Sequence, residues 1–201
     1  MDRFLISIEY EDIEPLIYLS KADLSVAPEL IEEIATTYRK IGYTVIVSTE
    51  EKAMSNLQNL FPKCLTVFTG QSGAGKSALL NRLMPQLNLE TAEISDALGR
   101  GRHTTRHVEL LPVADGLVAD TPGFSAINFS TITERELAKQ FPEFVQASSY
   151  CRFRECLHLN EPDCEVKRQV ETNDIAKSRY DNYVYFLDEI KNRKPVYKKK
   201  R

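Results

Sequence analysis

The chain has 201 residues, of which 42% are hydrophobic and 27% charged, and its formal net charge at pH 7 is −3. This composition is typical of a soluble globular protein, and the slightly acidic balance excludes a globally basic nucleic-acid-binding protein. No apolar run approaches the roughly 20 residues that a membrane span needs, and no signal peptide opens the sequence. We therefore expect a cytoplasmic protein with no membrane partner.

The spacing of apolar residues predicts a regular alternation of helices and strands. In chain order, the expected elements are a helix over 2–11, a strand over 14–19, a helix over 28–41, a strand over 43–47, a helix over 52–61, a buried strand over 64–69 and a helix from 78 that stops near Pro85. After a polar stretch over 87–105, strands are expected over 107–112 and 117–119, and helices over 134–144 and 176–191. This alternation predicts a parallel α/β sheet, in which ligands collect at the carboxyl ends of the strands.

A glycine-rich loop follows the strand that ends at residue 69. Its sequence is G-Q-S-G-A-G-K-S, which fits the phosphate-binding pattern G-x-x-x-x-G-K-[ST] between a strand and a helix. Glycines allow backbone N–H groups to surround an anion, while Lys76 should reach the β- and γ-phosphates and Ser77 should bind Mg²⁺. We expect phosphate contacts from Gly70, Gln71, Ser72, Gly73, Ala74, Gly75, Lys76, Ser77 and Ala78.

Two further loops have the form of nucleotide-binding motifs. Asp120-Thr121-Pro122-Gly123 matches D-x-x-G, in which the carboxylate of Asp120 holds a Mg²⁺-bound water and the N–H of Gly123 meets the γ-phosphate. Ser20-Lys21-Ala22-Asp23 resembles N-K-x-D, in which the Asp23 carboxylate accepts two hydrogen bonds that guanine offers and adenine does not. The alternatives are a plain turn for the first and a turn leading into a helix for the second.

The order of these motifs is unusual, because the base-reading loop precedes the phosphate loop. Lys21 would lie along the base and sugar, and Ser48 and Thr49 would form the second loop on the guanine side. This order is that of a circularly permuted GTPase. An unrelated ATPase or kinase with a phosphate-binding loop is the alternative.

Three of the four cysteines cluster near a histidine. Cys151, Cys156, His158 and Cys164 lie within one short segment, and three thiolates with one imidazole suit a tetrahedral, structural Zn²⁺. The alternative is a polar loop without a metal. The fourth cysteine, Cys64, stands alone in an expected strand, and we expect it to be a buried core residue.

The chain resembles the RsgA family of small ribosomal subunit biogenesis GTPases. The resemblance rests on the successive strings S-K-A-D, V-S-T, G-Q-S-G-A-G-K-S, G-R-H-T-T-R and D-T-P-G-F, followed by the cysteine and histidine spacing. It implies a circularly permuted P-loop NTPase-type α/β fold over 1–130 and a small helical zinc-binding domain with a basic tail over 131–201. It also implies GTP hydrolysis stimulated by the small ribosomal subunit and its rRNA, with GTP or GDP, Mg²⁺ and one Zn²⁺ bound. We expect a monomer.

The catalytic residues are expected in the polar stretch and the phosphate loop. Lys76 would stabilise charge on the γ-phosphate, Thr105 would join Ser77 on Mg²⁺, and His103 is the candidate to orient the attacking water. A structural or rRNA-facing role is the alternative for His103.

Two departures from the family pattern, and one difference from Ras-like proteins that the family shares, qualify this expectation. Ser20 stands where the family has asparagine, and Phe124 stands where Ras-like proteins have glutamine. The sequence also lacks the family's N-terminal OB-fold and the strand that would precede the first helix, which we expect to leave the neighbouring strands with unpaired backbone groups. A catalytically weak, nucleotide-gated ribosome-binding protein or a truncated paralogue is therefore the alternative function.

Overall fold

The computed structural model describes residues 1–71, 73–85, 109–120, 129 and 131–193, with the side chains of Glu109 and Asp120 excepted. The chain divides into two compact units, one formed by Met1–Pro15 with Ile127–Arg201 and the other by Leu16–Ala126. We call them the helical unit and the sheet unit. None of the described helices combines the length and the apolar character that crossing a bilayer requires. The predicted domain boundary at residue 130 stays a prediction.

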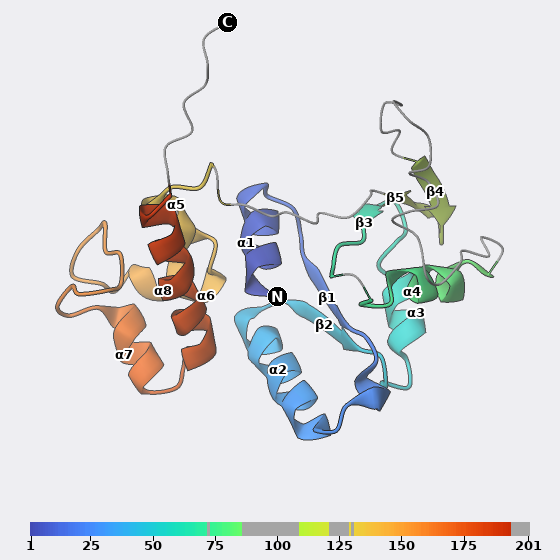
Figure 1. Cartoon of the computed structure of the whole chain (residues 1–201), viewed down its shortest axis with the longest axis horizontal. Coiled ribbons are helices and arrows are strands. Elements are labelled where there is room, and N and C mark those ends of the chain that lie inside the picture. Colours follow the sequence, from blue (N-terminus) through green and yellow to red (C-terminus); the bar gives the residue numbers. More distant parts are fainter. Residues whose placement is uncertain (72, 86–108, 121–128, 130, 194–201) are drawn as a thin grey trace, which may run out of the picture. The chain divides into compact units, whose positions relative to one another are not determined.

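The sheet unit alternates strands and helices (Figure 1). Its elements are β1 (Leu16–Leu19), a 3-10 turn η1 (Ala22–Leu24), α2 (Pro28–Ile41), β2 (Thr44–Val47), α3 (Ala53–Gln58), β3 (Leu65–Val67), α4 (Lys76–Leu83), β4 (Glu109–Val113) and β5 (Gly116–Asp120). The strands form two sheets. β1 pairs with β2 in parallel, and β5 pairs in parallel with β3 and antiparallel with β4. Helix α2 packs along β2.

One core joins the two sheets of this unit. Its buried residues come from β2, α3, the segment between α3 and β3, α4 and its C-cap residue, β4 and β5. They are Ile46, Ala53, Leu57, Phe61, Leu79, Leu80, Leu83, Met84, Val113 and Val118. Helix α4 contributes three of them, because its apolar residues at positions 79, 80 and 83 recur with helical spacing. The core therefore fixes α4, and with it the loop that precedes this helix.

The helical unit contains the remaining elements. These are α1 (Asp2–Tyr10), α5 (Glu134–Lys139), α6 (Pro142–Ser148), α7 (Glu165–Glu171) and α8 (Lys177–Lys191). Its core is aromatic: Phe141, Phe144 and Tyr183 have no exposed surface, and their rings contact one another at centroid distances of 4.9 to 5.5 Å. Such stacked and edge-to-face ring pairs add to the stability gained by burial.

A buried ion network fastens α1 to α6 and α8. The guanidinium of Arg179, 1% exposed, donates to Asp2 at 2.7 Å and to both carboxylate oxygens of Glu143 at 2.7 and 3.1 Å. Asn182 donates to the second oxygen of Asp2 at 2.7 Å. Burial alone would lower the pKa of Arg179, but the bonds to Glu143 and the charge of Asp2 outweigh it and raise the pKa. The guanidinium therefore stays charged and paired.

The structure corrects several element predictions. The expected helix over 134–144 is two helices, because Pro142 starts a new helix and cannot donate within the old one. Helix α7 was not predicted, since its apolar residues are too few to set a period. Strand β3 is not buried as expected: Leu65 is 62% and Val67 is 42% exposed. The prediction that Cys64 is a core residue is also wrong, because this side chain is exposed just before β3.

Candidate functional site

The phosphate loop connects β3 to α4. Gly73 and Gly75 have φ angles of +77° and +89°, which L-residues with a Cβ seldom adopt. Gly75 caps α4, so Lys76 and Ser77 occupy the first turn of this helix. The ammonium of Lys76 lies inside the loop, where it donates to the carbonyl oxygens of Gly70 at 2.7 Å and of Gln71 at 3.0 Å. A cation at a helix N-terminus beside a glycine loop is an arrangement that attracts phosphate.

The loop after β1 is hydrogen-bonded to the phosphate loop. The hydroxyl of Ser20 donates to the carbonyl of Ala74 at 2.6 Å, and the ammonium of Lys21 donates to the carbonyl of Gly73 at 2.7 Å. Lys21 adopts a left-handed conformation at φ +55°, which turns the chain into η1. These positions are 52 and 54 residues apart in sequence. Two of the predicted nucleotide loops therefore form one surface.

The loop after β2 joins the same group. The hydroxyl of Ser48 accepts from the N–H of Ala22 at 3.0 Å, and the N–H of Ser48 donates to the carbonyl of Leu19 at 2.9 Å. Asp23 and Thr49 are exposed beside these contacts. The carboxylate that sequence reasoning assigned to base recognition is thus accessible to a ligand.

The structure describes only some of the remaining residues that are predicted to bind the nucleotide. Ser77 is half-buried, Ala78 is exposed and the backbone of Asp120 ends β5, next to β3. Residues outside the described part of the chain are Ser72, His103, Thr105 and Gly123. The described geometry therefore covers the base-reading and phosphate loops, and the roles of the other residues stay predictions.

The predicted metal ligands come together in the helical unit. The ligand atoms of Cys151, Cys156, His158 and Cys164 all lie within 4.8 Å of one another. The Sγ atom of Cys164 is 3.4 Å from Nδ1 of His158 and 3.9 Å from Sγ of Cys151. Ligands of a tetrahedral zinc ion lie about 3.3 to 3.8 Å apart, given Zn–N and Zn–S bonds of about 2.0 to 2.3 Å. The cluster is therefore compatible with zinc.

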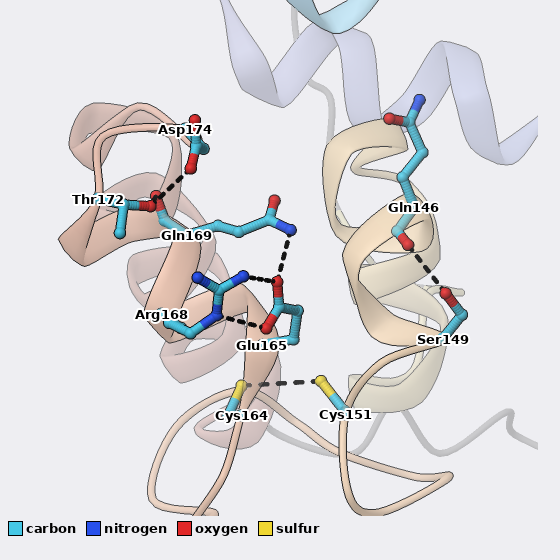
Figure 2. Close-up of polar contacts among 9 residues, drawn as sticks. All are labelled: Gln146, Ser149, Cys151, Cys164, Glu165, Arg168, Gln169, Thr172 and Asp174. Carbon is cyan, nitrogen blue, oxygen red and sulfur yellow. Dashed lines mark hydrogen bonds and ion pairs between the residues drawn. The ribbon is translucent and has the colours of Figure 1, made fainter.

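Two helices position the first and the last of the four candidate ligands in the sequence. Cys164 is the N-cap residue of α7, and Cys151 follows α6, and Figure 2 shows their sulfur atoms pointing toward each other. Close to this end of α7, Arg168 and Gln169 hold the carboxylate of Glu165 at 2.7 and 2.9 Å. The first turn of the helix that carries Cys164 is thereby braced.

Burial favours the neutral forms of two residues of the cluster. It raises the pKa of Cys156 to about 12 and lowers that of His158. Thiols kept neutral are poor metal ligands, but a bound divalent cation reverses this preference by stabilising thiolates. Three thiols and an imidazole enclosed together are thus a chemical fit for a soft divalent metal.

A second set of residues supports the backbone around the candidate ligands and was not identified from the sequence. Tyr180 donates to the carbonyl of His158 and Tyr183 to that of Leu157, both at 2.7 Å. Glu161 accepts from the N–H groups of Leu157 and Leu159 at 2.8 and 2.9 Å. Both tyrosines lie in the helix expected over 176–191, but nothing local in the sequence indicates where their hydroxyls bond. Such supporting bonds fix ligand orientation.

Comparisons with known proteins agree with this geometry. The family model of the RsgA GTPase matches residues 1–130. The small ribosomal subunit biogenesis GTPase RsgA of Enterococcus faecalis is 62% identical over 202 residues, which cover 100% of this chain and 68% of that protein. The protein of the same name from Bacillus subtilis is 50% identical over 203 residues, covering 98% and 68%.

Two solved structures are similar over nearly the whole chain. One is the crystal structure of YloQ, a circularly permuted GTPase, with 43% identity and a TM-score of 0.79 over 98% of this chain. The other is YjeQ from Thermotoga maritima, with 31% identity and the same TM-score over 96% of this chain. The chain spans 63% and 66% of the lengths of these two structures.

These similarities confirm the predicted circularly permuted P-loop fold with a helical region that carries a Cys3His cluster. They also confirm the predicted GTPase class. The chain belongs to the RsgA GTPase family.

Proposed function

We propose that this chain binds GTP and GDP with Mg²⁺ and hydrolyses GTP to GDP and phosphate during maturation of the small ribosomal subunit. The observation that carries the proposal is the pair of short hydrogen bonds from Ser20 and Lys21 to the phosphate loop. They hold the base-reading loop against the phosphate loop, so one nucleotide spans both. The names of the relatives supply the ribosomal partner.

In this proposal, Asp23 recognises guanine. Its exposed carboxylate would accept from the base N1–H and exocyclic amine, and the loop of Ser48 and Thr49 would donate a backbone N–H to the base oxygen. Ser20 supports this arrangement, because its hydroxyl makes the bond to Ala74. A hydroxyl has one donor where an asparagine amide has two, so we expect weaker nucleotide binding than with asparagine at this position.

In the same proposal, the phosphate loop binds the phosphates and Mg²⁺. On GTP binding, Lys76 would exchange the Gly70 and Gln71 carbonyls for the β- and γ-phosphates, and the backbone N–H groups would surround the same anion. Mg²⁺ neutralises charge on the phosphates, with Ser77 and Thr105 as its protein ligands. Asp120 would hold a Mg²⁺-bound water, and Gly123 would meet the γ-phosphate.

Water attack follows from the same arrangement. His103 is the residue proposed to orient the water for in-line attack, while Lys76 stabilises the charge that develops on the γ-phosphate. Because residue 124 is phenylalanine, no glutamine is available there, and we expect slow turnover without the ribosomal subunit.

The helical unit would carry one structural zinc ion. Cys151, Cys156, His158 and Cys164 supply four protein ligands and leave no open position, so this metal would organise the loop and take no part in hydrolysis. We further propose that the unit contacts ribosomal RNA, that the protein is cytoplasmic and that it acts as a monomer.

GTP turnover with and without purified small ribosomal subunits tests the function. We expect subunits to increase turnover at least about tenfold in the native chain and not in Lys76→Ala, because the loop cation is needed for the γ-phosphate. Lys52→Ala, an exposed lysine outside the loops, is the matched control and should behave as the native chain. Subunit binding without stimulated turnover would instead favour the nucleotide-gated binding protein.

A further inference from the structure

The edge of β2 that faces away from β1 is closed by polar groups from outside the sheet. Among the described strands, β2 pairs only with β1, and the N–H of Ser48 after β2 donates to the carbonyl of Leu19 in β1. Because the backbone groups of successive strand residues point to opposite sides, Val45 and Val47 direct their carbonyls away from β1. Carbonyls at a strand edge need other donors. A guanidinium and a backbone N–H of the following loop supply them.

The guanidinium is that of Arg39, in the last turn of α2. One of its Nη atoms donates to the carbonyl of Val45 at 3.1 Å and to the carboxylate of Glu50. Its other Nη atom lies 3.5 Å from the carboxylate of Glu32 on the same helix. Helix α2 packs along β2 (Figure 1), so this side chain reaches the strand and the loop after it together.

Glu50 belongs to the loop that would bind the base oxygen of guanine. The N–H of Ser48 donates to Leu19 at 2.9 Å, and the N–H of Glu50 donates to the carbonyl of Val47 at 3.0 Å. Between them, the N–H of the exposed Thr49 donates to no residue in the described part of the chain. Of these three N–H groups, that of Thr49 is thus the one left to bind a ligand.

The neighbours of Thr49 are anchored on both sides. On one side, the hydroxyl of Ser48 accepts from the N–H of Ala22 at 3.0 Å, which ties the loop to the base-reading segment. On the other side, Arg39 holds the carboxylate of Glu50. Thr49 lies one residue from each anchor, so the direction of its N–H depends on both.

We propose that Arg39 is a positioning residue for guanine recognition, which acts through the carboxylate of Glu50 to hold the N–H of Thr49 toward the base oxygen. This inference rests on the proposed guanine site and adds a residue outside the nucleotide contacts. The side chains of Arg39 and Glu50 are 37% and 35% exposed, and ion pairs at such exposure contribute little to stability. Removal of the pair should therefore change the selectivity of the loop and leave the fold intact.

Binding of two GDP analogues tests this role. 6-Thioguanosine diphosphate carries sulfur, a weak acceptor, in place of the base oxygen. The native chain should prefer GDP to this analogue, and Arg39→Ala should reduce the preference about threefold, because an N–H held less firmly distinguishes oxygen from sulfur less well. Inosine diphosphate keeps the oxygen and lacks the amine that Asp23 would bind. The preference for GDP over inosine diphosphate should therefore stay the same in Arg39→Ala.

The two carboxylates that contact Arg39 provide matched variants. Glu50→Gln removes the charge that Arg39 holds beside Thr49 and should reproduce the reduced preference. Glu32→Gln removes a charge that the same guanidinium contacts on α2, away from the loop, and should behave as the native chain. Arg39→Lys keeps a cation near Glu50 and should restore part of the preference.

Hydrogen exchange without nucleotide measures the anchor itself. The N–H of Glu50 should exchange about threefold faster in Arg39→Ala than in the native chain, and at the native rate in Glu32→Gln. Unchanged exchange at Glu50, an equal loss of preference in Glu32→Gln, or equal changes in both analogue preferences would overturn the proposal. GDP binding with an unaltered preference in Arg39→Ala would refute this inference alone, whereas no GDP binding by the native chain would refute the proposed function together with it.

Discussion

The two units of this chain differ in how completely they bury their side chains. In the helical unit, Phe141, Phe144 and Tyr183 are fully enclosed, and even the charged Arg179 is 1% exposed and paired on two sides. In the sheet unit, apolar strand residues remain exposed, among them Leu65 and Leu117 at 62% and 40%.

The polar contacts differ in the same way. The hydroxyls of Tyr180 and Tyr183 donate hydrogen bonds to backbone carbonyls around the Cys3His cluster, and these bonds organise that loop. Lys21 and Lys76, by contrast, donate to backbone carbonyls of the phosphate loop, where a phosphate would compete for them. The comparison teaches that polar groups of the helical unit bond to its own enclosed interior, whereas two lysines of the sheet unit bond at a place where a phosphate would compete for them.

Loss of a metal ligand should have the largest effect. Cys164→Ser is expected to abolish stoichiometric zinc binding and to lower the thermal midpoint of the helical unit by about 10 °C or more, because metal binding is coupled to folding. Zinc content by mass spectrometry and thermal unfolding by circular dichroism measure both. Cys64→Ser, at an exposed cysteine outside the cluster, is the matched control. Unchanged zinc content in Cys164→Ser would contradict the assignment.

Breaking the buried ion network should have the second largest effect on stability. Arg179→Ala leaves Asp2 and Glu143 buried without their cation, and the free energy of unfolding should fall by about 3 to 5 kcal/mol. Urea unfolding gives this value. Lys177→Ala, which breaks an exposed pair with Asp181 on the same helix, should leave stability nearly unchanged. Similar losses in both variants would show that burial does not distinguish these pairs.

The next effect in size is expected in the sheet unit, whose stability should increase when a nucleotide binds. GDP with Mg²⁺ at about 100 times its dissociation constant should stabilise the chain by about 2.7 kcal/mol, since it binds only the folded state. Lys76→Ala should lose most of this gain, as a shift in the thermal midpoint would report. A gain of equal size in Lys76→Ala would mean that the nucleotide binds elsewhere.

The smallest effect on stability is expected from removal of the Tyr183 hydroxyl. Tyr183→Phe keeps the ring in the core but leaves the Leu157 carbonyl without its donor, so stability should fall by about 1 kcal/mol. Tyr185→Phe, at a ring that is 64% exposed, should change little. If the Tyr183 variant retains full stability in urea unfolding, its bond does not support the metal loop.

Local signals in the sequence predicted the best-defined elements. Helix α2 begins at Pro28 and ends before Gly42, which has φ +113°, so both ends were fixed by residues with special backbone preferences. The Cys3His cluster was predictable because cysteine and histidine have few other reasons to lie close together in a sequence. The loop between β3 and α4 was predictable because its glycines adopt positive φ angles that few other residues adopt.

The failures concern contacts between distant residues. The exposure of Cys64 and Leu65 depends on which strands flank β3, and the composition of β3 itself does not reveal this. The partners of Arg179 are 36 and 177 residues away in sequence, so no local pattern indicated a buried cation. The break at residue 142 was predictable from its proline, but the apolar spacing across it suggested one helix.

Guanine nucleotide binding by the native chain and by Asp23→Ala tests the central claim most directly. Titration with fluorescent GDP, with GTP and ATP as competitors, measures both affinity and base preference. The account predicts that GTP displaces GDP far better than ATP, and that Asp23→Ala loses about tenfold or more in GDP affinity, because the carboxylate makes two hydrogen bonds to guanine. Equal competition by ATP, or unchanged GDP affinity in Asp23→Ala, would contradict the assignment of this loop to guanine.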